Sequence, residues 1–160
     1  YAFFLGASPT KVAEIFGCSK KEAVEAIEKF LGFYPELKEL KTKTIPKLAA
    51  QGWFEGLDGR KIVLDGEHTV LAAMLQSGES IVMKHALNLW HKQFKETGYN
   101  FALVNDVHDE YVTLSWEDEG TTKLMGKLQC KAIEETGKKF NMFCPLAGSY
   151  QIGSTWHDVH

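Results

Sequence analysis

Two neighbouring carboxylates, Asp109 and Glu110, lie in the tetrapeptide Val107–Glu110 (VHDE), between two segments that are typical of β-strands. Phe101–Val104 leads in, and Tyr111–Trp116 leads out with alternating apolar and polar residues. Carboxylates at a hairpin tip are hard oxygen ligands that suit Mg²⁺, an ion usually held by one or two carboxylates together with substrate phosphates. The tetrapeptide therefore indicates a metal site for phosphoryl transfer, although acidic hairpin tips also occur as ordinary solvated turns.

Three further stretches, together with VHDE, follow one another along the chain: Tyr1–Ser8 (YAFFLGAS), His68–Ser77 (HTVLAAMLQS) and Gly153–His160 (GSTWHDVH). In this order the four resemble segments of the family A DNA polymerases, the DNA polymerase I family. They are similar to the second half of the fingers helix called motif B, to the helix whose glutamine contacts the template–primer minor groove, to motif C (VHDE) and to the closing G-x-x-W-x-x-x-H. Gly56–Lys61 (GLDGRK) is similar to the version in short-tailed bacteriophages. The chain is therefore identified as a member of this family, in its bacteriophage-like branch.

The resemblance implies an α+β fold. A helical fingers portion would occupy about residues 1–66, and a palm portion about residues 67–160, in which an antiparallel β-hairpin carries VHDE. It also implies an enzyme, a DNA-directed DNA polymerase that transfers nucleotides by a two-metal-ion mechanism in DNA replication.

Four residues around VHDE bear on that chemistry. The resemblance makes Asp109 a ligand of both catalytic Mg²⁺ ions and Glu110 an auxiliary ligand, since successive strand residues point to opposite faces. His108 is similar to the family histidine that contacts the terminal phosphate or sugar of the primer, and a structural role is equally open. Asp106 lies in the same strand, but family members usually carry a neutral residue there, so it is not assigned to the site.

Three more residues align with family positions that contact nucleotide or DNA. Tyr1 takes the motif B position beside the sugar of the incoming nucleotide, and Gln76 takes the minor-groove position. Arg60 matches the family arginine of this hairpin and could contact the primer–template backbone or form a surface salt bridge. Leu5 and Ala72 depart from the pattern, which has tyrosine at the first position and, in phage relatives, asparagine at the second.

The family also needs a motif A aspartate and a motif B lysine, and both would precede Tyr1. We therefore expect a C-terminal part of a polymerase, completed by a missing N-terminal part in cis or as a split subunit. Alone it would be inactive, because Asp109 without the motif A aspartate gives an incomplete metal cage. The expected partners are primer–template DNA and deoxynucleoside triphosphates.

Composition suits a protein of a reducing compartment. The 160 residues are 44% hydrophobic and 12% aromatic, which is enough apolar material for a sizeable core. Three widely spaced cysteines favour neither a disulfide framework nor a zinc ribbon. No run of 18 apolar residues occurs, so no membrane partner is expected. These features predict a cytoplasmic protein, in the host cytoplasm if it is viral. The net charge of −3 gives no overall basic surface for DNA.

Capping signals predict where several helices begin. Ser8 before Pro9 is typical of a helix start, and Ser19 with Glu22 forms a capping-box pattern. The remaining expectations are a helix over 36–50 with a kink or boundary at Pro46, a hairpin over 52–64, helices over 67–97 and 119–139, and a last strand around 142–146. In the long helix, an apolar stripe is expected at Leu71, Leu75, Gly78, Val82, Ala86, Leu89 and Trp90.

Two other functions stay open. Lys11–Phe30 has the cadence of a helix-turn-helix unit, in which Lys20 and Lys21 would approach DNA phosphates, so a DNA-binding regulator is one alternative. A non-catalytic polymerase remnant is the other.

Overall fold

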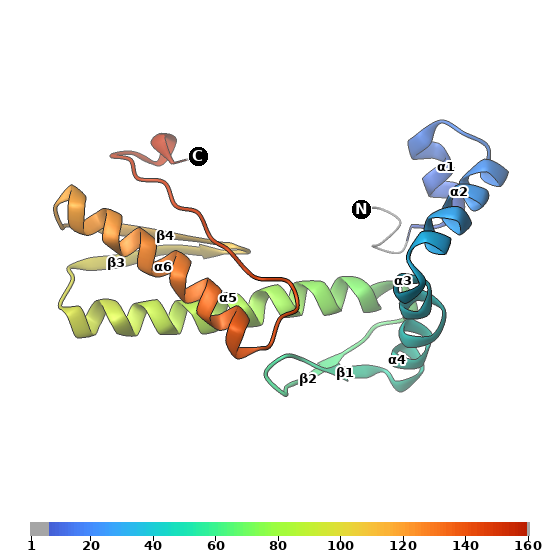
Figure 1. Ribbon diagram of the computed structural model, residues 1–160, viewed down its shortest axis with the longest axis horizontal. Coiled ribbons are helices and arrows are strands. Elements are labelled where there is room, and N and C mark those ends of the chain that lie inside the picture. Colours follow the sequence, from blue (N-terminus) through green and yellow to red (C-terminus); the bar gives the residue numbers. More distant parts are fainter. Residues whose placement is uncertain (1–6, 160) are drawn as a thin grey trace. The chain divides into compact units, whose positions relative to one another are not determined.

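The computed structural model describes residues 7–159, which form two compact units, the first ending at Ser77 and the second beginning at Gly78 (Figure 1). Helices dominate both units, and each contains one two-stranded antiparallel sheet. The fold class is therefore α+β, as the sequence predicted. Because the boundary lies within a helix, each unit is described by itself.

The first unit opens with α1 (Pro9–Phe16) and α2 (Lys20–Phe33), and the capping signals of the sequence act as predicted. The Ser8 side chain accepts a hydrogen bond from the backbone N–H of Lys11 at 3.3 Å. Ser19 and Glu22 form a complete capping box. A small buried cluster joins the two helices and comprises Val12, Ala13 and Ala23.

The predicted helix over 36–50 is interrupted by a π-helical turn. It consists of α3 (Pro35–Glu39), the π-turn η1 (Leu40–Thr44) and α4 (Ile45–Gln51). Pro46 has no N–H to donate, and a proline ring clashes with the carbonyl four residues earlier. The preceding turn is widened, so that the backbone N–H of Ile45 donates to the carbonyl of Leu40, five residues back.

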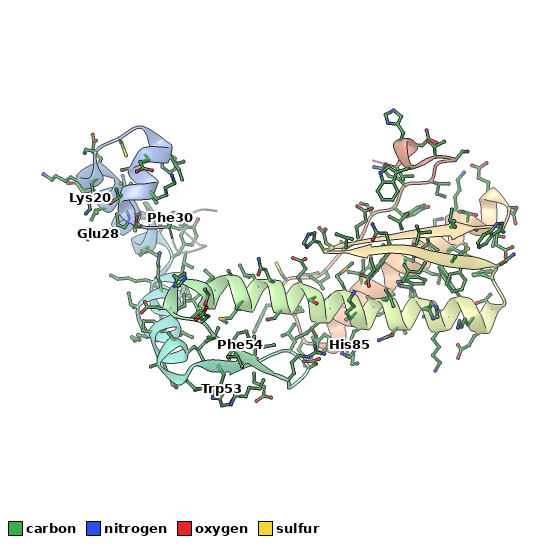
Figure 2. The ribbon with its side chains drawn as sticks, turned by 180° about the vertical axis from the view of Figure 1, so that it is seen from behind. Lys20, Glu28, Phe30, Trp53, Phe54 and His85 are labelled. Atoms are coloured by element: carbon green, nitrogen blue, oxygen red, sulfur yellow. The ribbon has the colours of Figure 1, made fainter. Side chains whose placement is uncertain are left out.

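A hairpin follows, formed by β1 (Trp53–Glu55) and β2 (Lys61–Val63), as the sequence predicted. Trp53 and Phe54 project to opposite sides of β1 (Figure 2). Phe54 is buried in a cluster with Ile45, Leu64 and Val70. The ring of Trp53 lies instead beneath Lys61, whose Nζ is 4.6 Å from its centroid.

The long helix α5 (Val70–Thr97) is preceded by the 3₁₀ turn η2 (Glu67–Thr69) and ends at Gly98, which has φ of 80°. From Gly78 onward it provides the core of the second unit. Ala86, Trp90 and Phe94 recur every four residues and are fully buried, against residues of α6 (Glu119–Lys139). One member of the predicted stripe, Leu75, is 57% exposed. The predicted stripe is wrong at that position. In this first part of α5 the buried side chain is that of Val70, which is fully buried.

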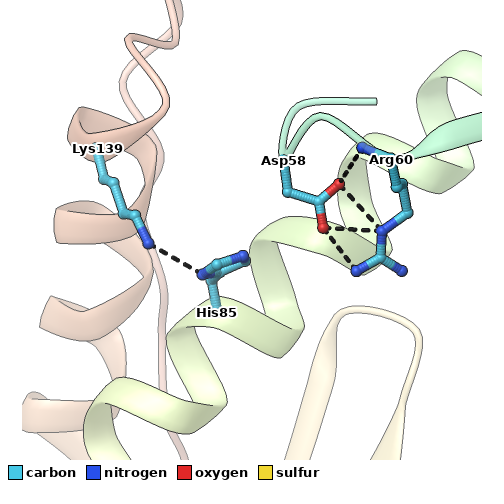
Figure 3. A network of polar contacts seen from close by, with 4 residues as sticks. All are labelled: Asp58, Arg60, His85 and Lys139. Carbon is cyan, nitrogen blue, oxygen red and sulfur yellow. Dashed lines mark hydrogen bonds and ion pairs between the residues drawn. The ribbon is translucent and has the colours of Figure 1, made fainter. Parts of the chain in front are cut away.

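A second contact joins α5 and α6 at the C-terminal end of α6. Nζ of Lys139 lies 3.1 Å from Nδ1 of His85 on α5 (Figure 3). The ring of His85 also meets that of Phe140 edge-on, with centroids 5.0 Å apart.

The chain after α6 runs back along that helix (Figure 1). Leu146 lies against Gly137, Gly148 against Cys130, and Tyr150 against Gly126. The predicted strand around 142–146 was wrong: within the described residues this segment packs by its side chains on a helix and pairs with no strand. A short 3₁₀ turn, η3 (Trp156–Asp158), follows. No helix in the described part of the chain is long and apolar enough to cross a membrane.

Candidate active site

The VHDE tetrapeptide closes a hairpin of β3 (Phe101–Val107) and β4 (Glu110–Ser115). Val107 pairs with Glu110, which leaves His108 and Asp109 as a two-residue loop. Asp109 therefore lies in the loop itself, and Glu110 is the first residue of β4. The hairpin predicted from the sequence is confirmed, and β3 extends three residues beyond the predicted Phe101–Val104.

The loop holds one residue in a costly conformation. His108 has φ of 52°, in the left-handed region that non-glycine residues rarely adopt, at a cost of about 1–3 kcal/mol. Such residues cluster at functional sites, where the surrounding structure holds them in place. The side chains of His108, Asp109 and Glu110 are all exposed, so the hairpin presents them together to a ligand.

A β-bulge at Val104 decides which side chains of β3 face the helices. Leu103 pairs with Thr113 but Asn105 pairs with Val112, so Val104 is an extra residue that reverses the alternation. As a result Asp106, which pairs with Tyr111, lies on the same face as Phe101 and Leu103. That face covers the core of the second unit, because Phe101 and Tyr111 pack against the buried cluster around Trp90.

The loop end of this face is fastened to α5. The hydroxyl of Tyr111 donates a hydrogen bond to the carbonyl oxygen of Met83, and its oxygen also lies 3.7 Å from Sδ of that residue. Lys84 forms an ion pair with Asp106. Burial, and next the charge of Asp106, raise the pKa of Tyr111 far above that of a free tyrosine, so the phenol stays protonated and able to donate.

The base of the hairpin is fastened to α6 by polar contacts. Gln129 donates to the hydroxyl of Thr113 at 2.9 Å, and the hydroxyls of Ser115 and Thr122 are 2.9 Å apart. The apolar residues that alternate with them turn the other way, and Leu114 is 54% exposed. The site is thus carried by a hairpin anchored at both ends.

Mg²⁺ fits the donor set of the loop only in part. Asp109 and Glu110 supply adjacent carboxylates of the kind the ion prefers. Between residues 7 and 159, however, no three His, Cys, Asp or Glu side chains gather as a metal-binding group. The two carboxylates would therefore hold Mg²⁺ together with ligands from phosphates, water or another acidic residue.

Of the other predicted site residues, Arg60 and Gln76 belong to the first unit. Arg60 lies in the turn after β1 and forms an ion pair with Asp58. Its Nε and Nη2 atoms are 2.8 Å and 2.6 Å from Oδ2 of Asp58 (Figure 3). This bond with Arg60 is the main reason why the pKa of Asp58 is lowered. Gln76 is exposed on α5. Tyr1 and the departure at Leu5 lie outside the described residues.

Sequence reasoning missed the anchoring residues Met83, Lys84 and Tyr111. The available signal was Asp106, an unexpected charge within a strand, which needs a partner if it is turned inward. Its partner could not be named without knowing that the Val104 bulge turns Asp106 toward α5.

Comparisons with known proteins agree on one family. The family described as DNA polymerase family A matches residues 1–158. The chain is 32% identical to the DNA-directed DNA polymerase of Escherichia phage Phieco32, over all of this chain and 27% of that protein. It is 25% identical to the DNA-directed DNA polymerase of Enterobacteria phage T3, over all of this chain and 25% of that protein. The chain thus spans about a quarter of the length of these relatives.

A solved structure has the same fold. It is the POL domain of Pol1 from M. smegmatis in complex with DNA primer-template and dNTP, with a TM-score of 0.75 and 19% identity. The likeness covers 85% of this chain and 26% of that one. With the family match extending over nearly all its residues, this chain belongs to DNA polymerase family A.

Proposed function

We propose that the polypeptide carrying this chain is a DNA-directed DNA polymerase, to which the chain contributes part of the fingers (about residues 1–66) and a palm portion (about 67–160). The observation that carries the proposal is the placement of Asp109. In a chain of family A, this carboxylate of the VHDE tetrapeptide is exposed in a two-residue loop of an anchored hairpin. A rigid support is what a metal-binding carboxylate needs if it is to position reacting groups.

In this proposal Asp109 is the principal metal ligand and Glu110 an auxiliary one, for the two Mg²⁺ ions of the complete enzyme. Bound Mg²⁺ would neutralise phosphate charge and stabilise the attacking and leaving oxygens of nucleotidyl transfer. His108 stands beside Asp109 in the loop and is suited to contact the end of the primer. The outward position of Glu110 at the start of β4 supports its different role, because it leaves the loop to Asp109.

The remaining site residues would contact nucleotide and DNA. Tyr1 would lie beside the sugar of the incoming deoxynucleoside triphosphate, and exposed Gln76 would reach the minor groove of the primer–template. Arg60 would approach the DNA backbone, with a guanidinium group whose orientation Asp58 fixes. The M. smegmatis domain is a complex with primer-template and dNTP, which supports the same partners here.

Completeness of the metal site requires an acidic residue beyond Asp109 and Glu110, because no third ligand joins them among residues 7–159. We propose that it comes from the part of the polymerase that precedes this chain, in cis or as a separate subunit. The chain alone would then be inactive. Its helix-turn-helix cadence over Lys11–Phe30 lies inside the family match and needs no separate regulatory function.

Primer extension tests the proposal on the complete polypeptide that carries this chain. Asp109→Asn keeps the shape of the side chain but removes its charge, and should lower the rate about 100- to 1,000-fold. Glu28→Gln, a matched loss of one exposed negative charge on α2, should leave the rate unchanged. A wild-type polypeptide that binds primer–template but extends no primer would instead favour the non-catalytic remnant. Sequence-specific duplex binding without Mg²⁺ or a 3′ primer end would favour a regulator.

A further inference from the structure

We propose that Lys84 and Asp106 form a positioning pair that fixes the loop carrying Asp109. This inference rests on the proposed function, because it assigns the pair a task in nucleotidyl transfer. Neither residue belongs to the VHDE tetrapeptide, and Asp106 occupies a position where members of the resembled family usually carry a neutral residue.

The position of Asp106 in the hairpin supports this role for the ion pair. Asp106 and Tyr111 pair directly across the two strands, and only the Val107–Glu110 pair separates them from the loop. Both members of the Asp106–Tyr111 pair are held by successive residues of α5, Lys84 and Met83. The last inward-facing pair of the hairpin is thus fastened on both strands to a single turn of one helix.

Because Asp106 is largely buried, breaking this ion pair should cost more than breaking an ordinary surface salt bridge. The side chain of Asp106 is only 19% exposed, whereas that of Lys84 is 54% exposed. Removing the lysine would leave a largely buried carboxylate without its cation, beneath a loop that already carries two acidic residues. The carboxylate would then turn outward to regain water, and a shift of about 1 Å at a reacting group can cost about 100-fold in rate.

The pair also depends on the β-bulge. If β3 kept its regular alternation through Val104, with no bulge there, Asn105 would occupy the inward face and Asp106 would point away from α5. The bulge and the ion pair are therefore parts of one arrangement, in which an acidic residue of β3 is turned inward and neutralised there.

The test measures primer extension by the complete polypeptide for Lys84→Met, Asp106→Asn, Lys84→Arg and the exchanged pair Lys84→Glu with Asp106→Lys. Lys84→Met and Asp106→Asn should each lower kcat about tenfold with KM for the nucleotide changed less than about twofold. Lys84→Arg and the exchanged pair should restore most of the rate. Lys92→Met, which breaks an exposed ion pair with Glu96 on the same helix, is the matched control and should change nothing.

Amide hydrogen exchange provides a second measurement, which does not depend on polymerase activity. Exchange at residues 106–111 should be about tenfold faster in Lys84→Met and unchanged in Lys92→Met. Unchanged exchange and unchanged kcat in Lys84→Met would overturn the positioning role, as would a loss of kcat that neither Lys84→Arg nor the exchanged pair restores. A wild-type polypeptide without polymerase activity would overturn the proposed function, while the exchange data would still show whether the pair orders the loop.

Discussion

Tyr150 of the C-terminal segment lies directly against Gly126 of α6, so closely that a methyl group at position 126 would come 2.5 Å from Cδ2 of the tyrosine ring. Gly126 and Gly137 are buried eleven residues apart, which is about three helical turns, and therefore share a face of α6. Leu146 covers Gly137 in the same way. The absence of side chains at these two positions is what allows the segment to lie along the helix.

Gly126→Ala should therefore destabilise the chain. Alanine favours a helix interior over glycine by about 1 kcal/mol, but the overlap with Tyr150 should cost about 1–3 kcal/mol, so that the net change is unfavourable. Urea denaturation measures it. Gly32→Ala in α2, where a methyl group meets nothing within 4 Å, is the control and should stabilise by about 1 kcal/mol. In a Tyr150→Ala background, Gly126→Ala should become stabilising, and failure of that reversal would contradict the assigned contact.

Tyr111→Phe should lower stability by about 1 kcal/mol at pH 7, because the hydrogen bond to the carbonyl of Met83 is lost. The substitution should also change how the free energy of unfolding depends on pH in the alkaline range. The pKa of Tyr111 is raised in the folded chain, so its contribution is complete below the ordinary tyrosine value of 10.0 and declines as the pH rises above it. Urea denaturation at pH 7 and pH 10.5 should show a smaller decline for Tyr111→Phe than for the wild type. The control is Tyr34→Phe, at a half-exposed tyrosine, which should show the same decline in the free energy of unfolding as the wild type.

Arg60 and Gln76 should differ in how salt affects their contribution to primer–template binding by the complete polypeptide. Arg60→Ala should weaken binding and reduce the slope of log affinity against log salt by about 1, since one phosphate contact is lost. Gln76→Ala should weaken binding with the slope unchanged, because its amide carries no charge. Fluorescence anisotropy across a salt series measures both. An unchanged slope for Arg60→Ala would mean that its guanidinium serves only the ion pair with Asp58.

Features that depend on neighbours a few residues away could be predicted from the sequence. The cap at Ser8, the capping box of Ser19 with Glu22 and the end of the long helix at residue 97 all form as predicted, because a cap is satisfied within three or four residues of the chain. Family membership was likewise readable, since VHDE and the other ordered segments are short and local. The tight turn of VHDE follows from the strand signals on both sides.

Features that depend on distant partners were decided by the tertiary structure. Alternation in β4 could not reveal that Ser115 faces α6 while Leu114 is exposed. The tryptophan of the terminal motif, Trp156, is a further case, since it is 55% exposed although its side chain is large and apolar. In each case the direction of a side chain depends on which surface the element meets.

The sequence by itself determined the family and the local pattern of helices and strands, and it singled out Asp109 as the residue on which the proposed chemistry depends. Only the tertiary structure revealed the support of that residue. A single extra residue at Val104 reverses the faces of β3, and it brings Asp106 to a lysine that lies 22 positions away in the sequence. Strand side chains alternate with a period of two, so one inserted residue exchanges the inward and outward sets, and no local signal in this sequence marks the insertion.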